Sequence, residues 1–138
     1  MILIADANII VSALIRNSAT RKLIIKSSHS LFTPDFVFEE IDKHIKLISK
    51  KNSLSVEENR RVLSIISDYI ETVSKEVYLS NIPVAEEIIG QIDYKDIPYV
   101  ALALTITNDG IWTEDEDFQR QKKIKVWRTK DLLRLEKF

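Results

Sequence analysis

The stretch Met1-Ile2-Leu3-Ile4-Ala5-Asp6-Ala7-Asn8-Ile9-Ile10 decides how the rest of the chain is arranged. An apolar run rich in β-branched residues ends at Asp6, and its lack of alternation is typical of a strand covered on both faces. Such strands lie in the middle of parallel sheets, whose ligand sites lie just beyond the carboxyl ends of the strands. Asp6 is therefore either a site residue at a strand end or the N-cap of the following helix.

Strand and helix patterns alternate along the rest of the chain. Short strands are expected at residues 31–33, 71–73, 110–113 and 125–127. Helices are expected at residues 9–27 in two pieces, at 35–51, 55–70 and 82–89, from 96 through 104, and at 131–137. This alternation predicts an α/β fold in which helices cover both faces of a parallel sheet.

Three details of these helices are open to test. The break in residues 9–27 is expected near Asn17 and Ser18, with Thr20 as the cap of the second piece. Residues 55–70 start a helix at Ser55. The side chains expected to be buried by that helix are Val62, Ile65, Ile66 and Tyr69.

Composition limits the classes of function. The 138 residues predict one domain over 1–138, and the 45% apolar and 30% charged contents are typical of a soluble globular protein. A formal net charge of −1 excludes a bulk electropositive nucleic-acid binder, so phosphate contacts must come from local patches or metal ions. The absence of cysteine excludes thiol chemistry and fits the cytoplasm, and we expect neither a signal peptide nor a membrane span.

Carboxylates and hydroxyls remain as the chemical groups of the chain. The two glycines, Gly90 and Gly110, are too far apart for a phosphate-binding glycine loop. The two histidines, His29 and His44, are too few for a histidine-based metal site.

Four acids are candidates for one site. Asp6 and Asp115 follow apolar strand patterns, and Asp96 precedes a helix that Pro98 starts. Helix phase places Glu40 at the edge of the apolar stripe and Glu39 on the solvent side, because residues three and four apart share a face. The alternative for each acid is a helix cap or a surface charge.

Converging carboxylates need a cation. They repel one another, which raises their pKa values, and a divalent ion relieves the repulsion. Hard oxygen ligands suit Mg²⁺ or Mn²⁺, which can activate water for attack on a phosphodiester. Asp93 precedes the helix start, where we expect a solvated or supporting role rather than direct metal binding.

Four motifs in order resemble the PIN domain family: Asp6-Ala7-Asn8, Glu40-Ile41, Asp96 before Val100-Ala101-Leu102-Ala103, and Thr113-Glu114-Asp115-Glu116-Asp117. The resemblance spans nearly the whole chain. It implies a three-layer sandwich with a parallel sheet of about five strands flanked by helices. One departure is Ala7, which stands where the family more often has threonine or serine.

The resemblance also implies an activity. It implies Mg²⁺- or Mn²⁺-dependent cleavage of single-stranded RNA, as in toxin ribonucleases that form homodimers and are inhibited by an antitoxin protein. Asp6, Glu40, Asp96 and Asp115 match the metal-binding acids. Asn8 and Thr113 match residues that orient these acids, and Asp117 matches a frequent additional acid.

Three other classes compete with this interpretation. An aspartyl-phosphate phosphatase needs a second acid two residues after the first, where this chain has Asn8. A phosphoacceptor receiver domain needs paired acids early in the chain, yet the first acid after Asp6 is Asp35. A catalytically degenerate PIN domain that binds RNA or protein without cutting remains open, because a fold does not fix a function.

Basic and aromatic residues complete the candidates. Two groups of basic residues differ in their expected role. The group that follows Asp115 in the sequence is expected to contact phosphates, and the earlier group is expected to form a solvated surface. The expected phosphate contacts are Arg120, Lys122, Lys123, Lys125, Arg128 and Lys130, and the solvated group is Lys43, Lys46, Lys50 and Lys51. Trp112 and Trp127 lie in strand patterns, which favours core packing over base stacking.

Overall fold

Five parallel strands form the sheet at the centre of the molecule. In the computed structural model, which describes residues 1–16 and 18–136, the strand order is β3-β2-β1-β4-β5. The strands are β1 (Ile2–Ala5), β2 (Ser30–Pro34), β3 (Ile70–Val73), β4 (Gly110–Trp112) and β5 (Val126–Trp127). All neighbouring pairs are parallel, which confirms the predicted α/β class and the sheet of about five strands.

The first strand is the central one, as its unbroken apolar pattern predicts. Ile4 pairs with Phe32 of β2 on one side and with Ile111 of β4 on the other. Leu3, Ile4 and Ala5 have no exposed surface. The carboxyl end of β1 therefore lies between the ends of two neighbouring strands, where side chains from all three can meet.

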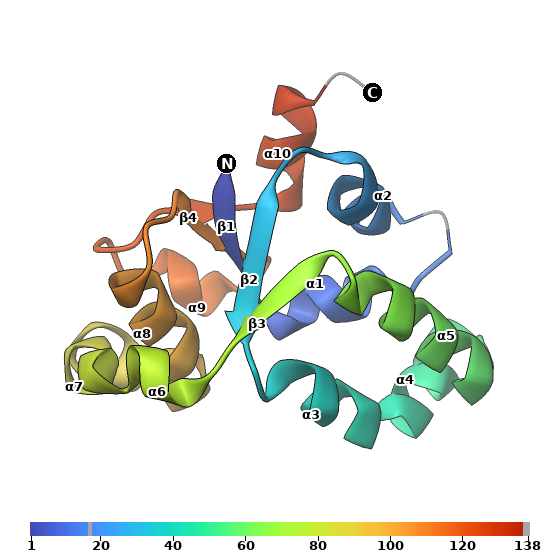
Figure 1. The fold of residues 1–138 in the computed structure, drawn as a ribbon, viewed down its shortest axis with the longest axis horizontal. Coiled ribbons are helices and arrows are strands. Elements are labelled where there is room, and N and C mark those ends of the chain that lie inside the picture. Colours follow the sequence, from blue (N-terminus) through green and yellow to red (C-terminus); the bar gives the residue numbers. More distant parts are fainter. Residues whose placement is uncertain (17, 137–138) are drawn as a thin grey trace.

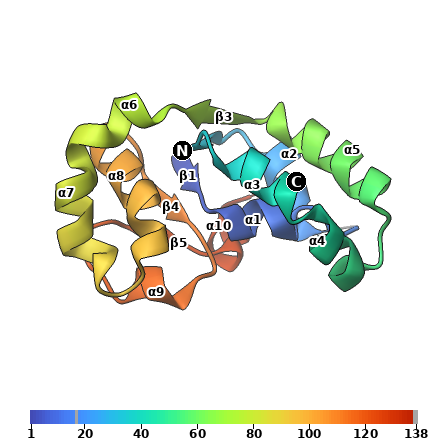
Figure 2. The ribbon, with the colours of Figure 1, turned by 90° about the horizontal axis from the view of Figure 1, so that it is seen from below.

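Helices cover both sides of this sheet. Figures 1 and 2 show α6, α7 and α8 on one side and α1, α2 and α5 on the other, and this is the expected three-layer arrangement. The first five helices are α1 (Ala7–Ser12), α2 (Ala19–Lys26), α3 (Val37–Lys43), α4 (Ile45–Asn52) and α5 (Val56–Ser67). The others are α6 (Lys75–Tyr78), α7 (Ile82–Ala85), α8 (Ile97–Thr105), α9 (Glu116–Gln119) and α10 (Thr129–Leu135).

The helix expected over residues 35–51 is wrong as a single element. His44, with φ −101° and ψ 14°, separates α3 from α4. Ile41 before the break and Ile45 after it are both buried. The bend thus keeps apolar side chains of both helices against the core.

The second helix begins earlier than expected. Ser18 caps α2, because its hydroxyl accepts a hydrogen bond from the Arg21 amide at 3.2 Å. The expectation that Thr20 is the cap is wrong, since Thr20 is buried inside the first turn. Asn17, the other residue of the expected break, lies outside the described residues.

Helix α5 confirms its predicted start but not its whole buried face. The Ser55 hydroxyl accepts from the Glu58 amide, and the Glu58 carboxylate accepts from the Ser55 amide, which forms a capping box. Ile66 is buried as expected, but Ile65 and Tyr69 are 47% and 44% exposed. Asn59, Leu63 and Ile66 form the buried stripe instead.

Two further helices differ from their expected limits. The 82–89 segment is a short α7 followed by a π-helical turn at Glu86–Gly90. Helix α10 begins at Thr129 rather than at residue 131, and Lys137, its expected end, lies outside the described residues. Among the described residues, no helix combines the length and apolar character needed to cross a bilayer.

Candidate active site

Asp6 and Thr113 meet at the carboxyl ends of two neighbouring strands. Asp6 follows β1 and Thr113 follows β4, and the Asp6 amide donates to the Trp112 carbonyl at 3.1 Å. The Thr113 hydroxyl donates to Asp6 Oδ2 at 2.7 Å, and both side chains are buried. Asp6 occupies the N-cap position of α1 but makes no side-chain capping hydrogen bond there. Its carboxylate is oriented mainly by Thr113 at the end of the neighbouring strand, while the nearby Ala7 and Asn8 amides also favour its charged form.

The same threonine is linked to a second acid. The Thr113 hydroxyl accepts a hydrogen bond from the Asp115 amide at 3.0 Å. Asp115 itself caps α9, with Oδ1 accepting from the Asp117 amide at 2.9 Å. One oxygen of Asp115 therefore acts as a helix cap, which was the alternative to a site role for this acid. The position of that carboxylate is fixed by the turn that leads from β4 into α9.

Two more acids come from the turn before α8. Asp93 caps a 3₁₀ turn at Tyr94–Asp96, with Oδ1 accepting from the Lys95 amide at 3.0 Å. Asp96 ends this turn and precedes Ile97, the first residue of α8, as the position of Pro98 predicts. Packing of α8 against the sheet, with Val100 and Ala101 fully buried, holds Asp96 in place.

Four of these carboxylates form one cluster. Each of Asp93, Asp96, Asp115 and Asp117 offers an oxygen, and these oxygens all lie within 4.8 Å of one another. Asp6 and Glu40 are not members of this group. The cluster thus joins two of the four expected metal-binding acids, Asp96 and Asp115, with Asp93 and Asp117, which the sequence suggested only as supporting residues.

Asp96 is the acid that the fold satisfies least. Its side chain is 6% exposed, and Oδ2 is buried without a hydrogen-bond partner. Burial, followed by the charges of Asp93 and Asp115, raises the pKa of Asp96 to about 8. A buried carboxylate in this setting either takes up a proton or binds a cation.

Neighbouring acids have pKa values shifted in the same direction. Burial raises the pKa of Asp6, which the Thr113 hydrogen bond partly opposes and the charge of Asp115 reinforces. Partial desolvation and then Asp115 raise the pKa of Asp117, although Arg120 lies 3.9 Å from it. The end of the sheet therefore holds more negative charge than its surroundings neutralise.

A cleft of about 610 Å³ opens over these residues. Glu40 of α3 lines it and Glu39 does not, in agreement with the helix-phase prediction. The exposed Asn8 side chain also lines it, whereas Thr113 and Asp117 lie outside the lining. The acidic side chains in the lining are Asp6, Glu40, Asp93, Asp96 and Asp115.

Two residues that support the site were missed from the sequence. The Thr33 hydroxyl donates to the Ala5 carbonyl at 2.9 Å and so ties the ends of β2 and β1 together next to Asp6. Tyr99 lies under the cleft in edge-to-face contact with Phe36 and Phe118, each at 6.3 Å between ring centroids. Tyr99 follows Asp96 by three residues, and this spacing could have predicted that the two side chains share a face of the helix.

The basic and tryptophan predictions have mixed outcomes. Trp112 is fully buried, as expected of a core residue, and half-buried Trp127 donates to the Asp109 carbonyl. Arg128 pairs with Glu116 at 2.9 Å, and the Lys125 ammonium lies 4.6 Å from the Trp127 ring centroid. Phosphate contacts by this basic group stay a prediction.

Comparison with known proteins agrees with the fold and the acidic cluster. A family model described as PIN domain matches residues 4–135. The chain therefore belongs to the PIN domain family, whose members are generally nucleases. No curated protein matches the chain.

Proposed function

We propose that this chain is a Mg²⁺- or Mn²⁺-dependent endoribonuclease that cleaves single-stranded RNA. One observation carries the proposal: four carboxylates converge within 4.8 Å around Asp96, whose buried Oδ2 lacks a hydrogen-bond partner. Membership of a family of nucleases supports hydrolysis as the reaction class. A bound divalent cation would give Oδ2 its missing partner and offset the mutual repulsion of the acids.

The residues present fit such an ion. All the donors are carboxylate oxygens, and the cluster contains no histidine or cysteine, so the set favours a hard cation over zinc or copper. We assign Asp96 and Asp115 as direct ligands. Asp6 and Glu40 face the same cleft and are the two further ligands that the family resemblance implies.

The chain's own residues have distinct roles in this proposal. Thr113 holds Asp6 through a 2.7 Å hydrogen bond and fixes the Asp115 backbone, so it orients two acids at once. Asn8 is exposed in the cleft, where its amide can bind substrate or orient an acid. When bound, the cation would supply Lewis acidity that activates water and stabilises the leaving oxygen.

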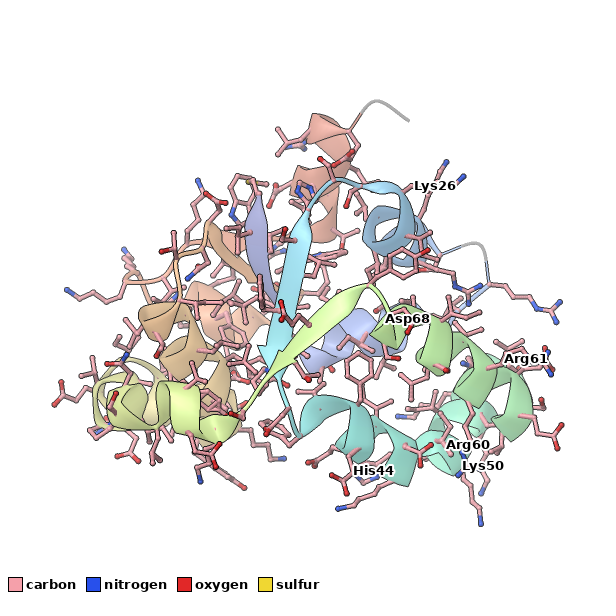
Figure 3. All side chains as sticks on the ribbon, viewed as in Figure 1. Lys26, His44, Lys50, Arg60, Arg61 and Asp68 are labelled. Carbon is pink, nitrogen blue, oxygen red and sulfur yellow. The ribbon has the colours of Figure 1, made fainter. Side chains whose placement is uncertain are left out.

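Cleavage of a circular single-stranded RNA tests this function. We expect purified protein to open the circle in Mn²⁺ or Mg²⁺, and EDTA to prevent opening, because the circle has no ends for an exonuclease. Asp96→Asn is the inactive variant. Asp68→Asn is the matched control, since Asp68 is an exposed acid where α5 meets β3 (Figure 3) and does not line the cleft.

Two results would contradict the nuclease proposal. Cleavage that persists in EDTA would show that the activity does not depend on a divalent cation. Absence of cleavage across varied RNA substrates, together with RNA binding, would favour the degenerate PIN module that binds without cutting.

A toxin role is the finer part of the proposal, and it includes an antitoxin and a homodimer. A groove of about 450 Å³ between α1 and α4 supports a protein partner, because Ile15 and Leu47 in its lining are each 53% exposed. The gene adjacent to this one provides a direct test. If it encodes no small DNA-binding protein, the toxin role loses its support while the nuclease proposal stands.

A further inference from the structure

Tyr94 is the most exposed large side chain of apolar or aromatic character among the described residues. It is 70% exposed, whereas the next, Leu135, is 56% exposed. Tyr94 lines the acidic cleft, and the fold gains little from its ring, which stays mostly in water. An uncovered aromatic ring at the edge of a polar site is available to a ligand.

The backbone beneath this ring is fixed relative to the acidic cluster. Tyr94 begins the 3₁₀ turn that ends at Asp96. The Asp96 amide donates to the Asp93 carbonyl at 3.1 Å, and the Asp93 amide donates to the Ile89 carbonyl at 2.8 Å. Since Asp93 and Asp96 belong to the cluster, the ring is carried by the same short turn as two of its acids.

Lys95 places a positive charge at this edge of an otherwise acidic cleft. Five acids line the cleft, and Lys95 is the one cationic side chain among its described lining residues. It is exposed, and its backbone amide is held by the Asp93 carboxylate. An aromatic ring and an ammonium group on adjacent residues suit a nucleotide, which presents a flat base next to a phosphate.

We infer that Tyr94 stacks on an unpaired nucleobase beside the phosphodiester at the acidic cluster, and that Lys95 contacts a neighbouring phosphate. This inference rests on the proposed function and names the feature that would favour single strands. In a duplex the bases are stacked on each other, so their faces are not open to a side chain. Stacking is tolerant of sequence, since every base has a π face.

Binding of a fluorescent single-stranded RNA, followed by anisotropy in Ca²⁺, tests the stacking. Ca²⁺ takes the same oxygen ligands and allows binding to be measured apart from cleavage in Mn²⁺. We expect Tyr94→Ala to weaken binding roughly 5- to 150-fold, and Tyr94→Phe to change it by no more than about twofold. Tyr69→Ala is the matched control, because Tyr69 is 44% exposed and outside the cleft lining.

An abasic series identifies the contact as stacking. A series of RNAs that each lack one base should include one position where the loss weakens wild-type binding as much as Tyr94→Ala does. At that position the base loss should have no further effect on Tyr94→Ala, because the same contact is already missing. A merely structural role for Tyr94 would lower the melting temperature and weaken all the RNAs equally.

The contribution of Lys95 can be measured separately, from the salt dependence of RNA binding. Lys95→Ala should reduce the slope of log affinity against log salt by about 0.7, the value for one phosphate contact on a single strand. Tyr94→Ala should leave this slope unchanged, because stacking releases no counterions.

The outcomes separate this inference from the proposed function. Cleavage by the wild type with unchanged RNA binding by Tyr94→Ala overturns the stacking inference and leaves the nuclease standing. Binding that depends on Tyr94 without any metal-dependent cleavage supports stacking and contradicts the nuclease. A wild type that neither binds nor cleaves RNA overturns both.

Discussion

The two ends of the sheet treat charge in opposite ways. At the amino end, the Ile2 amide donates to Asp109 Oδ2 at 2.8 Å, and His29 Nε2 lies 3.0 Å from Glu136 Oε1. At the carboxyl end, Asp93, Asp96, Asp115 and Asp117 face one another, with Arg120 3.9 Å from Asp117. One end joins segments far apart in the chain by complementary groups. The other concentrates like charges, which costs stability unless a ligand offsets the repulsion.

This difference indicates where the fold is built for stability and where for function. Two buried side-chain atoms among the described residues lack a hydrogen bond, His29 Nε2 and Asp96 Oδ2. His29 faces the carboxylate of Glu136, but Asp96 is buried among like charges, which a sequence selected only for stability would avoid. Local conflicts of this kind are expected at functional sites. The following predictions test the division, beginning with the largest effect.

Removing the central acid should abolish activity without unfolding the protein. Asp96→Asn should lower the cleavage rate by roughly 1000-fold, because several kcal/mol of charge stabilisation depend on the ion it binds. Asp93→Asn should lower the rate only about 10-fold, as expected of a supporting residue. Rates on single-stranded RNA measure both effects, and circular dichroism should show both variants folded. An active Asp96→Asn beside an inactive Asp93→Asn would mean that the ligand is misassigned.

A substitution at the amino end of the sheet should instead lower stability. Gly110 begins β4 with φ +136°, and a Cβ there would lie 2.5 Å from the Lys125 carbonyl oxygen. Gly110→Ala should therefore lower the free energy of unfolding by roughly 2–4 kcal/mol, measured in urea.

The other glycine is the control for this change. At Gly90 the nearest atoms to a Cβ are 3.6 Å away, so Gly90→Ala should change the free energy of unfolding by less than about 1 kcal/mol. Equal effects of the two substitutions would argue against backbone strain at Gly110.

The metal-free protein should lose stability as pH rises. Asp96 has a folded pKa of about 8 against 3.8 for an unperturbed carboxyl, so folded protein keeps a proton that unfolded protein releases across this interval. Stability is thus greatest below about pH 4 for this group and falls as pH approaches 8. In EDTA the melting temperature should be roughly 5 °C lower at pH 8 than at pH 5.

Two variants identify the source of this pH dependence. Asp96→Asn should lose much of the decline, because the amide does not titrate. Asp68→Asn should keep it, because Asp68 is exposed and does not line the cleft. A wild-type melting temperature that does not fall between pH 5 and pH 8 would contradict the buried, unpartnered state of Asp96.

The smallest expected effect comes from one hydrogen bond at the amino end. Asp109→Ala removes the acceptor of the Ile2 amide and should cost about 1 kcal/mol of unfolding free energy. The activity per folded molecule should stay that of the wild type. A loss of cleavage without a loss of stability would mean that the two ends are coupled.

The sheet could be predicted from the sequence because its strands carry strong signals. The unbroken run from Ile2 to Ala5 indicates a central strand, and Pro34-Asp35 marks the end of the second strand. Helix phase was less reliable: it placed Glu40 at the cleft, but it also assigned Ile65 to the core, where Leu63 lies instead. No proline or glycine in the sequence predicts the break at His44. The break is seen only in the structure, where Ile41 and Ile45 on either side of it are both buried.

The site was predictable in its chemistry more than in its geometry. Acids after strands could be identified, because the carboxyl ends of parallel strands meet at one edge. Which oxygens come within reach of one another depends on turns that periodicity does not describe, and so Asp93 and Asp117 join Asp96 and Asp115 while Asp6 and Glu40 do not. The role of Thr33 depends on strand pairing and left no local signal.

Binding of Mn²⁺ to the folded protein tests the central claim most directly, because it does not require the RNA substrate to be known. In thermal unfolding, Mn²⁺ at about 100 times its dissociation constant should stabilise the wild type by roughly 2.7 kcal/mol. Asp96→Asn should show little of this rise, Asp6→Asn a weaker rise than the wild type, and Asp68→Asn the full rise. An equal rise in wild type and Asp96→Asn, or none in either, would contradict a metal site at the acidic end of the sheet.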